Sequence, residues 1–462
     1  MLRINPHCNT ADLRKSIEEL WGLSSRKLRA LRARYDLSEG APVFTERGRY
    51  RSRGWTEWTL GFYFGSMLLQ FDATEDRSFL EEGAEGTIRH MVNYTTHTGV
   101  HDHGFNVVST FGNLYRLGRE GRFEIDPWQR RYLELALRTS AAVQAARWTA
   151  IGDGGFIYSF NGPHSLFADT IRTLRVLALG HRLGHVLLGE SDQRVSLLER
   201  LIGHALTTAR YAVYFGTGRD AYDVAGRVAH ESLFNTVDGS YRCPSTQQGF
   251  SPRSTWTRGL AWIILGFAEE LEFLESVDPD DGGFCLPKTE VLSRMLDAAR
   301  VTADYYLESS PANGIPYWDT AAPGLQHLPA WTESPADPYN DYEPVDSSAA
   351  AIAAQGLLRL GRLLQEQGDR EAGRRYWQAG LTVAASLFQA PYLSGQEEHE
   401  GLLLHSVYHR PNGWDYVPPG RRVPCGESSM WGDYHARELA LYLQRFDRSE
   451  PYLCFWGGEL TE

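Results

Sequence analysis

Cysteine is scarce in this sequence, and the few copies are scattered. The 462 residues contain five cysteines and no C-x-x-C pair. An odd number of widely spaced cysteines argues against a disulfide framework and against a zinc ribbon. The first ten residues also lack the apolar core of a secretory signal peptide. We therefore expect reduced thiols and a cytoplasmic protein. The cysteines are Cys8, Cys243, Cys285, Cys425 and Cys454.

An excess of basic charge and a long apolar run are both missing. The chain has 46 Lys and Arg residues against 58 Asp and Glu residues, a net charge of −12. Nucleic acids and anionic membranes require a basic surface, so we expect neither as a partner. With this net charge, an anionic substrate must be held by a local arginine. The longest apolar stretch, around residues 259–268, is about half as long as a membrane span.

The signatures of several catalytic classes are absent too. There is no H-E-x-x-H zinc motif and no G-x-S-x-G turn for a serine nucleophile. His97, His101 and His103 lie close together, but spacings of four and two residues do not suit three metal ligands on one helix. Residues 152–155 are rich in glycine yet lack the Lys-Ser/Thr of a phosphate loop. We therefore expect neither a metal ion nor a cofactor.

Aromatic residues, by contrast, are abundant. They make up 12% of the chain and include 13 Trp and 23 Tyr. Such rings either fill the core or line a sugar pocket, because the C–H faces of a sugar stack on indole rings. Composition alone leaves both interpretations open.

A helical pattern recurs six times along the chain. In each copy a polar or aromatic cluster opens an apolar helix rich in small residues, and most copies have a glycine about ten residues later. The copies open near residues 54, 101, 169, 254, 346 and 431. Between them we predict amphipathic helices near residues 12–34, 76–95, 127–146, 194–213, 292–307 and 368–388. No credible run of alternating strands is present.

Apolar helices that alternate with amphipathic ones indicate two concentric rings. We therefore predict an all-α fold, an (α/α)6 barrel of six inner and six outer helices. Residues 1–462 are interpreted as a single domain. Residues 309–345, which include seven prolines, and residues 389–427 are predicted to be long loops at the rim. The site is expected at the end where the inner helices begin.

The residues that open the inner helices should meet at one rim as a cluster of acids, aromatics and arginine. Their plainer interpretation is structural, because Asp is a favoured N-cap and Trp is most often a core residue. Capping is the favoured role for Asp346, whereas Asp102 and Asp169 are explained equally well by capping and by chemistry. The residues are Trp55, Trp58, His101, Asp102, Asp169, Trp256, Arg258, Asp346, Trp431 and Asp433.

Short motifs follow one another along the chain. Residues 101–105 read H-D-H-G-F, Asp169 is followed by Thr-Ile, and residues 248–262 read Q-G-F-S-P-R-S-T-W-T-R-G-L-A-W. Later come I-P-Y-W-D from residue 315, D-S-S-A from residue 346 and W-G-D-Y from residue 431. In this order they resemble the unsaturated glucuronyl hydrolase family, from about Trp55 to Tyr434. The resemblance implies an (α/α)6 barrel and an unsaturated uronyl oligosaccharide as substrate.

The resemblance also implies roles for single residues. Asp169 corresponds to the general acid and base, and Asp102 to a second essential carboxylate. Two departures have no assigned role: His103 stands where an aliphatic residue is usual, and residues 152–156 lengthen the segment before Asp169. The histidine-rich segment before Cys425 is expected on the aglycone side. The implied substrate-binding residues are Trp58, His101, Trp148, His230, Gln248, Trp256, Arg258 and Trp262.

The implied reaction adds water to the C4=C5 double bond of an unsaturated uronic acid at the non-reducing end. Asp169 would give a proton to C4 and then take one from the water that attacks C5. We expect the stacked Trp surroundings and the charge of Asp102 to raise the pKa of Asp169, giving a mildly acidic optimum. Arg258 is expected either to pair with the uronate carboxylate or to support the pocket.

Other functions stay open at this point. The alternatives are an unsaturated rhamnogalacturonyl hydrolase, an inverting glucanase or sugar epimerase on the same barrel, and a non-catalytic sugar-binding barrel. The sequence assigns neither the parent polysaccharide nor the oligomeric state.

Overall fold

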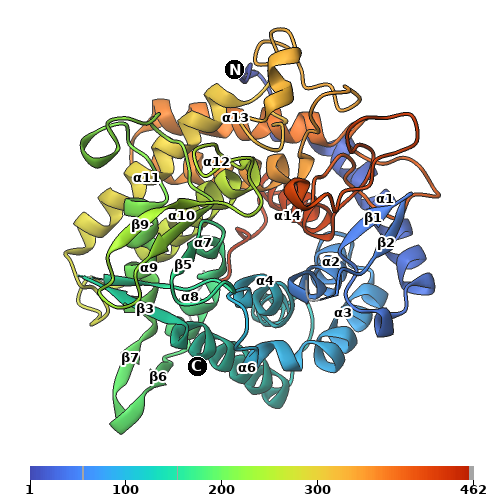
Figure 1. Ribbon diagram of the computed structural model, residues 1–462. Coiled ribbons are helices and arrows are strands. Elements are labelled where there is room, and N and C mark those ends of the chain that lie inside the picture. Colours follow the sequence, from blue (N-terminus) through green and yellow to red (C-terminus); the bar gives the residue numbers. More distant parts are fainter. Residues whose placement is uncertain (55–56, 153, 457–462) are drawn as a thin grey trace.

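Helices dominate the molecule and form two concentric rings (Figure 1). The computed structural model describes residues 1–54, 57–152 and 154–456. Along these residues, six inner helical segments alternate with six outer helices. Each inner segment packs against the next, and the last packs against the first, which closes the ring. The predicted (α/α)6 barrel is confirmed.

The bounds of the two rings agree closely with the predicted ranges. The inner segments are α2 (Leu60–Thr74), α4 with α5 (His103–Val107 and Asn113–Arg119), α7 with α8 (Thr170–Thr173 and Arg175–Arg182), α10 (Thr257–Glu275), α12 (Ser347–Glu366) and α14 (Met430–Asp447). The outer helices are α1 (Arg14–Arg34), α3 (Arg77–His90), α6 (Pro127–Ala146), α9 (Leu197–Tyr211), α11 (Lys288–Ser309) and α13 (Arg370–Leu387).

The inner helices are buried on all sides, and small residues allow their close approach. A Cβ atom added to Gly104 in α4 would lie 2.1 Å from the carbonyl oxygen of Thr173 in α7. One added to Gly61 in α2 would lie 2.5 Å from the backbone of Asn106. Glycine inside a helix costs about 1 kcal/mol relative to alanine. Here the contact between backbones explains why glycine is present.

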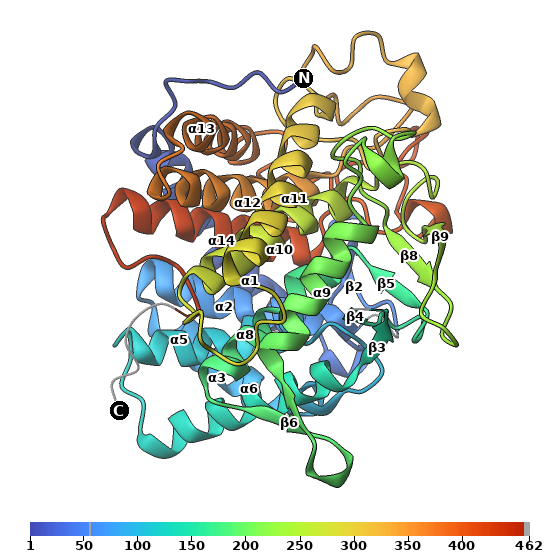
Figure 2. The same cartoon turned by 90° about the vertical axis from the view of Figure 1, so that its left-hand side faces the viewer.

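The outer helices bury one face each and show the other to water (Figure 2). In α11 the buried residues recur at spacings of three and four, as the sequence pattern predicted. This amphipathic pattern places α11 against α10, its inner neighbour.

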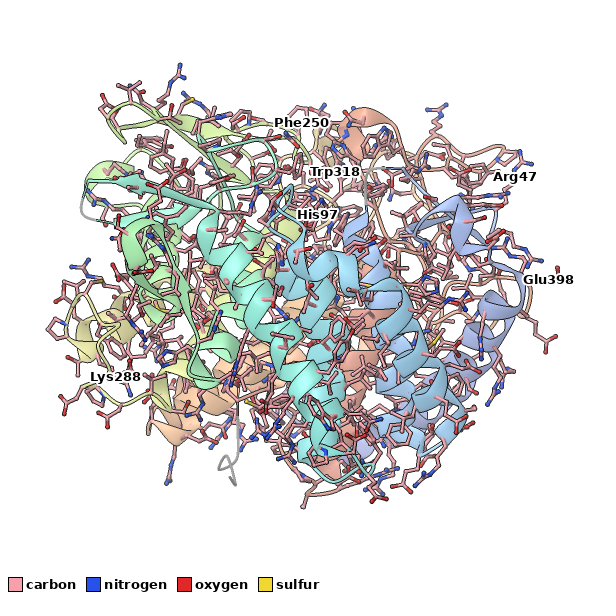
Figure 3. The ribbon with its side chains drawn as sticks, turned by 90° about the horizontal axis from the view of Figure 1, so that it is seen from below. Arg47, His97, Phe250, Lys288, Trp318 and Glu398 are labelled. Atoms are coloured by element: carbon pink, nitrogen blue, oxygen red, sulfur yellow. The ribbon has the colours of Figure 1, made fainter. Side chains whose placement is uncertain are left out.

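The loops that precede α4, α10 and α12 lie toward one end of the barrel (Figure 3). His97, Phe250 and Trp318 come before α4, α10 and α12, and they lie toward the same end. Lys288, the first residue of an outer helix, lies toward the other end because outer helices run opposite to inner ones. The opening residues of the inner helices therefore do converge.

Nine short strands lie in the described connections between helices, and the sequence did not reveal them. They have three to five residues each, which is too short for an alternating pattern to show. Each pairing is antiparallel: β1 with β2, β3 with β4, β6 with β7, and β5–β8–β9. The strands are β1 (Phe44–Glu46), β2 (Arg49–Arg51), β3 (Trp148–Ile151), β4 (Gly154–Ile157), β5 (Ser165–Phe167), β6 (Val186–Leu188), β7 (Arg194–Ser196), β8 (Glu231–Phe234) and β9 (Tyr241–Ser245).

Two long connections precede α12 and α14. Residues 309–345 contain one short helical turn, Pro323–His327, and residues 389–427 contain another, Arg410–Asn412. A continuous apolar core includes residues from Leu2 to Trp456. This core supports our proposal that the chain forms a single domain. Among the described residues, none of the helices is both long enough and apolar enough to cross a bilayer.

Candidate active site

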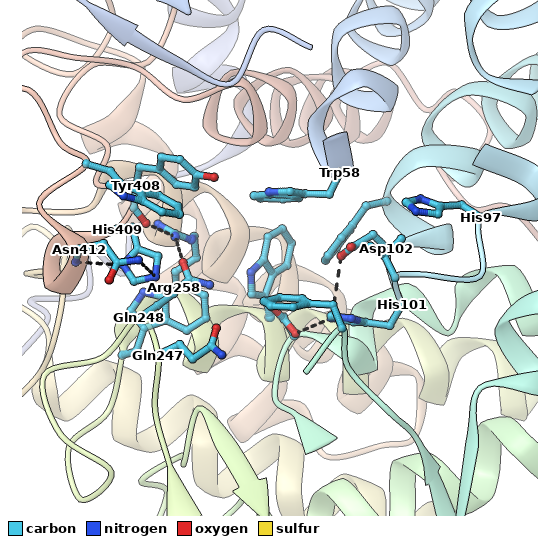
Figure 4. Close-up of a pocket in the computed structure, with 17 residues that line it drawn as sticks. Trp58, His97, His101, Asp102, Gln247, Gln248, Arg258, Tyr408, His409 and Asn412 are labelled. Carbon is cyan, nitrogen blue, oxygen red and sulfur yellow. Dashed lines mark hydrogen bonds and ion pairs between the residues drawn. The ribbon is translucent and has the colours of Figure 1, made fainter. Parts of the chain in front are cut away.

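A cavity of about 440 Å³ opens at the end where the inner helices begin (Figure 4). Its walls come from the starts of inner helices and from four loops that precede them, those before α4, α7, α10 and α14. The lining residues are Trp58, His97, Val100, His101, Asp102, Phe105, Phe160, Asp169, Gln247, Gln248, Trp256, Arg258, Trp262, Tyr408, His409, Asn412 and Trp414.

Asp102 and Asp169 lie in this cavity with His101 between them. The Nε2 atom of His101 lies 3.3 Å from Oδ1 of Asp169 and 3.9 Å from Oδ1 of Asp102. Both aspartates occupy N-cap positions, of α4 and α7, yet neither side chain accepts a capping hydrogen bond. Both carboxylates are therefore available to a ligand, and capping does not explain them.

The electrostatics of this trio differ from what the sequence suggested. Burial would raise the pKa of Asp169, but the hydrogen bond and charge of His101, with His230 and Arg258 nearby, outweigh it and lower that pKa. Burial raises the pKa of Asp102; His101 opposes this effect and Asp169 adds to it. The expected rise for Asp169 is therefore wrong for the free site, because the sequence did not show that His101 contacts Asp169 directly.

His101 is the third member of the trio. Burial lowers its pKa, but the two flanking carboxylates more than compensate, and the net shift is upward. Two acids and one imidazole therefore share protons, with Asp169 ionised in preference to Asp102. An arrangement of this kind can move a proton to and from a ligand in the cavity.

Arg258 supports the cavity wall through nearly all its donors. Its Nη1 atom donates to Asp346 and to the carbonyl of Val407. Its Nη2 atom donates to the side chain of Gln248 and to the carbonyl of Tyr408. A guanidinium has five N–H groups, so one is left. The guanidinium also lies between the rings of Trp256 and Trp431, 4.6 and 4.9 Å from their centroids. Of the two roles left open, support of the pocket is the one that these contacts favour.

Aromatic rings form the floor and one wall of the cavity. Trp58 stacks on Trp431 with ring centroids 4.9 Å apart, so Trp431 backs the wall from behind. Phe105 packs against Trp262 deeper in the barrel, with centroids 4.8 Å apart. Phe160 lies parallel to the ring of His101 at 6.2 Å. These aromatic side chains on different sides of the cavity suit a ligand with apolar faces, such as a sugar.

Trp148 and His230, both predicted to bind substrate, do not line this cavity. Trp148 lies in the β3–β4 hairpin, which turns its ring toward α9 and Arg200. His230 lies behind the wall, where its Nδ1 accepts a hydrogen bond from the backbone of Gln247 at 3.0 Å and its ring packs on Trp256. Burial lowers the pKa of His230 to about 4, so it acts as a neutral support.

Other residues of the predicted rim cluster have structural roles. Asp346 caps α12 and binds Arg258, as favoured from the sequence. Asp433 accepts hydrogen bonds from the backbone of residues 402 and 403 and from the hydroxyl of Tyr50. His103 contacts Ser140 and the carbonyl of His97, and burial lowers its pKa to about 4. Trp55 lies outside the described residues.

The sequence analysis missed several lining residues. Three of them, Tyr408, His409 and Trp414, belong to the second long loop, which was only expected near the aglycone. Phe160 follows the β3–β4 hairpin and has no motif around it that would mark it. Gln247 precedes the matched block by one residue, so proximity to that block was the available signal.

Two buried carboxylates hold the loops that line the cavity. Asp319 accepts hydrogen bonds from the backbone of Phe250 and the hydroxyl of Ser254, both at 2.8 Å. Asp415 accepts from the backbone N–H groups of Tyr408 and His409. Burial raises the pKa of each of these two aspartates to about 6. The positions of Gln248 and Tyr408 therefore depend on the hydrogen bonds that Asp319 and Asp415 accept.

Comparisons with known proteins cover nearly the whole chain. It is 26% identical over 442 residues to the unsaturated glucuronyl hydrolase of Bacillus sp. (strain GL1), covering 93% of this chain and 96% of that protein. It is 23% identical to the unsaturated chondroitin disaccharide hydrolase of Streptococcus agalactiae serotype III, covering 84% and 81%. No family model matches the chain.

The fold comparison gives the same result. The structure of the Bacillus protein matches with a TM-score of 0.68 at 24% identity, over 96% of this chain and 98% of that one. An unsaturated glucuronyl hydrolase specific for heparin matches with a TM-score of 0.71 at 18% identity, over 94% and 98%. Fold, cavity and relatives together define a glycosidase built on an (α/α)6 barrel. Within that class, the curated relatives and the matching fold support membership of the unsaturated glucuronyl hydrolase family.

Proposed function

We propose that this enzyme releases a 4,5-unsaturated uronic acid from the non-reducing end of an oligosaccharide made by a polysaccharide lyase. The observation that carries the proposal is the meeting of Asp102 and Asp169 beside His101 in an aromatic cavity, with neither carboxylate used as a helix cap. The names of the relatives give the substrate class.

The reaction begins when Asp169, in its protonated form, gives its proton to C4 of the ring. Positive charge then develops at C5 and on the ring oxygen, and water attacks C5 while the Asp169 carboxylate takes a proton from it. The product is a hemiketal at C5. Its C5–O bond breaks to leave a ketone, the freed oxygen forms an aldehyde at C1, and the aglycone leaves as an alcohol.

Asp169 must hold a proton before it can act as an acid, although its pKa in the free site is lowered. The uronate carboxylate brings another negative charge into the cavity, and a like charge raises the pKa of a nearby acid. Asp102, whose pKa is raised, is the nearest proton store, and His101 lies between the two. We therefore assign Asp102 and His101 to setting the protonation of Asp169.

The remaining assigned residues hold the sugar. Trp58, Trp256 and Trp262 supply apolar faces for the ring, and Gln248 offers its amide N–H groups because its oxygen already accepts from Arg258. Arg258 keeps Gln248 and the 407–408 backbone in place. Tyr408, His409 and Trp414 lie on the loop that we assign to the aglycone side.

Ultraviolet absorbance tests the proposal, because hydration destroys the conjugated chromophore. Unsaturated disaccharides prepared by lyases from heparin and from chondroitin are incubated with the enzyme, and the absorbance is expected to fall for at least one of them. Release of reducing ends from a saturated glucan without that fall would replace the proposal with a glucanase. Binding without turnover would replace the proposal with a sugar-binding barrel. Turnover confined to a rhamnose-linked disaccharide would replace it with an unsaturated rhamnogalacturonyl hydrolase.

We also keep three predictions about context: a cytoplasmic location, independence of metals and cofactors, and no partner among nucleic acids or membranes. Cys243 and Cys285 are exposed thiols, which fits a reducing compartment. The described residues hold no group of three or more side chains placed to bind a metal ion.

A further inference from the structure

A second cavity, of about 710 Å³, lies on the flank of the barrel. It is formed by α9, by α11 with the loop before it, and by the β3–β4 hairpin (Figure 2). It shares no lining residue with the first cavity. Of the residues that the resemblance assigns to substrate binding, Trp148 alone lines it.

Arg200 is the central feature of this second cavity. Its guanidinium lies over the ring of Trp148, 4.1 Å from the centroid. Within the described part of the chain it forms neither a hydrogen bond nor an ion pair, and its Nε atom is buried without a partner. Burial lowers the pKa of Arg200, although an arginine still stays charged at neutral pH. A charged fork that is partly desolvated and unpaired calls for an anionic ligand.

The local backbone fixes this arrangement. Cβ atoms on Gly155 and Gly203 would lie 2.3 and 2.9 Å from the ring of Trp148, so the ring lies flat against both glycines. With the guanidinium of Arg200 also over its ring, Trp148 does not serve as a stacking platform for a sugar. Its role is to hold Arg200 in place by a cation–π contact.

More positive charge lines the same cavity. Arg210, ten residues after Arg200 on α9 and about 80° away around the helix axis, also lines the cavity, and Arg294 comes from α11. Glu199 and Asp297 are the acidic lining residues, and Arg294 is already paired with Glu290 on its own helix, so the argument for an anionic ligand rests on Arg200.

The rest of the wall is apolar. Leu206 and Phe215 lie on the α9 side, and Leu286 lies in the loop before α11. A ligand that fits both parts has an anionic group for the arginine fork and C–H faces for the apolar wall. Sugars that carry a carboxylate or a sulfate have both features.

We propose that this second cavity is a binding site for an anionic sugar unit, a uronate or sulfated residue of an acidic oligosaccharide. The choice of a sugar among possible anions rests on the proposed function, since an enzyme acting on fragments of acidic polysaccharides works among such chains. The site holds a saturated part of the glycan near the enzyme and takes no part in the chemical step.

The test uses a saturated uronate-containing hexasaccharide, which has no double bond and cannot be turned over. Its dissociation constant is measured by calorimetry for the wild-type enzyme and for Arg200→Gln, Arg200→Lys, Asp169→Asn and Arg89→Gln. Arg89 is exposed on α3, away from the second cavity, and provides a matched loss of charge. Arg200→Gln is expected to weaken binding at least tenfold, and Arg200→Lys by a smaller factor because the planar fork is lost while charge is kept. Arg89→Gln and Asp169→Asn should bind like the wild type.

Two further measurements complete the test. Turnover of an unsaturated disaccharide by Arg200→Gln should equal that of the wild type, and binding should weaken as salt is added. A second variant, Leu286→Glu, puts a negative charge on the wall and should also abolish binding. Sulfated and unsulfated forms of the probe identify the preferred group, and inorganic sulfate and phosphate serve as simple competitors.

The proposal is overturned if Arg200→Gln and Leu286→Glu bind the hexasaccharide as tightly as the wild type does, or if the wild type does not bind it at millimolar concentration. Binding that is lost only in Asp169→Asn would place the probe in the first cavity and also overturn it. Failure of the proposed activity is separate, because it appears as absence of turnover of the unsaturated disaccharide, whatever the saturated probe does.

Discussion

The imidazole of His101 contacts the carboxylate of Asp169, with 3.3 Å between Nε2 and Oδ1, although 68 residues separate them in the chain. Asp102 lies 3.9 Å from the same nitrogen. This contact decides which of the two carboxylates is ionised in the free enzyme, because it lowers the pKa of Asp169 while burial raises that of Asp102.

Replacement of Asp169 by Asn tests its assignment as the general acid and base. The amide has a similar shape but cannot give or accept the proton, so turnover should fall by about 100- to 10,000-fold, about 3–5 kcal/mol. Loss of absorbance of an unsaturated disaccharide measures the rate. Asp280→Asn, in an exposed loop, is the matched control and should keep full activity. Turnover of Asp169→Asn close to the wild-type rate would remove Asp169 from the mechanism.

Replacement of His101 by Gln tests its effect on the protonation of Asp169. The hydrogen bond and charge of His101 lower the pKa of Asp169, and burial raises it. Without the imidazole the effect of burial dominates, so the pKa of Asp169 rises. Activity that needs protonated Asp169 declines as pH rises through this pKa, so the alkaline limb of kcat/KM should move to higher pH. The pH profile of His327→Gln, on the first long loop, should match the wild type. An alkaline limb of kcat/KM at the wild-type pH in His101→Gln would contradict the role of His101 in setting the protonation of Asp169.

The helices were predictable because burial on all sides and burial on one face leave different patterns. The predicted range 127–146 coincides with α6, and small residues such as Gly104 marked the inner ring. The meeting of Asp102 and Asp169 followed from the same geometry, since both residues open inner helices. Patterns over many residues carried these predictions.

The remaining features depend on contacts that spacing does not encode. Trp148 was expected in the pocket, but a hairpin of four-residue strands turns it outward, and Phe160 lines the cavity after that hairpin. Strands this short have too few residues to show a period. The pKa of Asp169 likewise depended on the orientation of one side chain, His101, which no sequence pattern fixes.

Replacement of Arg258 by Lys separates its two possible roles. A lysine keeps the charge but cannot reach Asp346, Gln248 and two carbonyl oxygens together, so the free energy of unfolding should fall by about 1–3 kcal/mol. Both kcat and KM should worsen because the 407–408 backbone shifts. Denaturation with urea and steady-state kinetics measure these effects, with exposed Arg253→Lys as the control. A higher KM with unchanged kcat and stability would instead indicate direct contact with substrate.

Stability should depend on pH through Asp415. Its pKa in the folded state is raised to about 6 by burial, while Arg258 and Asp346 are the charged groups near it. The stability that it contributes is present below the unfolded pKa of about 4 and is lost as pH rises through 6, by about 3 kcal/mol at most. The advantage of the wild type over Asp415→Asn in free energy of unfolding should therefore be larger at pH 4.5 than at pH 7.5. An equal difference at both values would contradict the raised pKa.

The last prediction joins the fold to the site through Gly104, two residues after Asp102. In Gly104→Ala the new methyl group would meet the backbone of Thr173, 2.1 Å from its carbonyl oxygen, so α4 and α7 must move apart. Overpacking of this kind costs about 1–3 kcal/mol. Because Asp102 precedes α4 and Asp169 precedes α7, the same movement should separate the two carboxylates and reduce kcat. Gly282→Ala is the control, since a Cβ there meets nothing within 4 Å, and it should leave both stability and activity unchanged. If Gly104→Ala lost stability yet kept the wild-type kcat, the close approach of these two helices would serve the barrel alone and not the geometry of the acids.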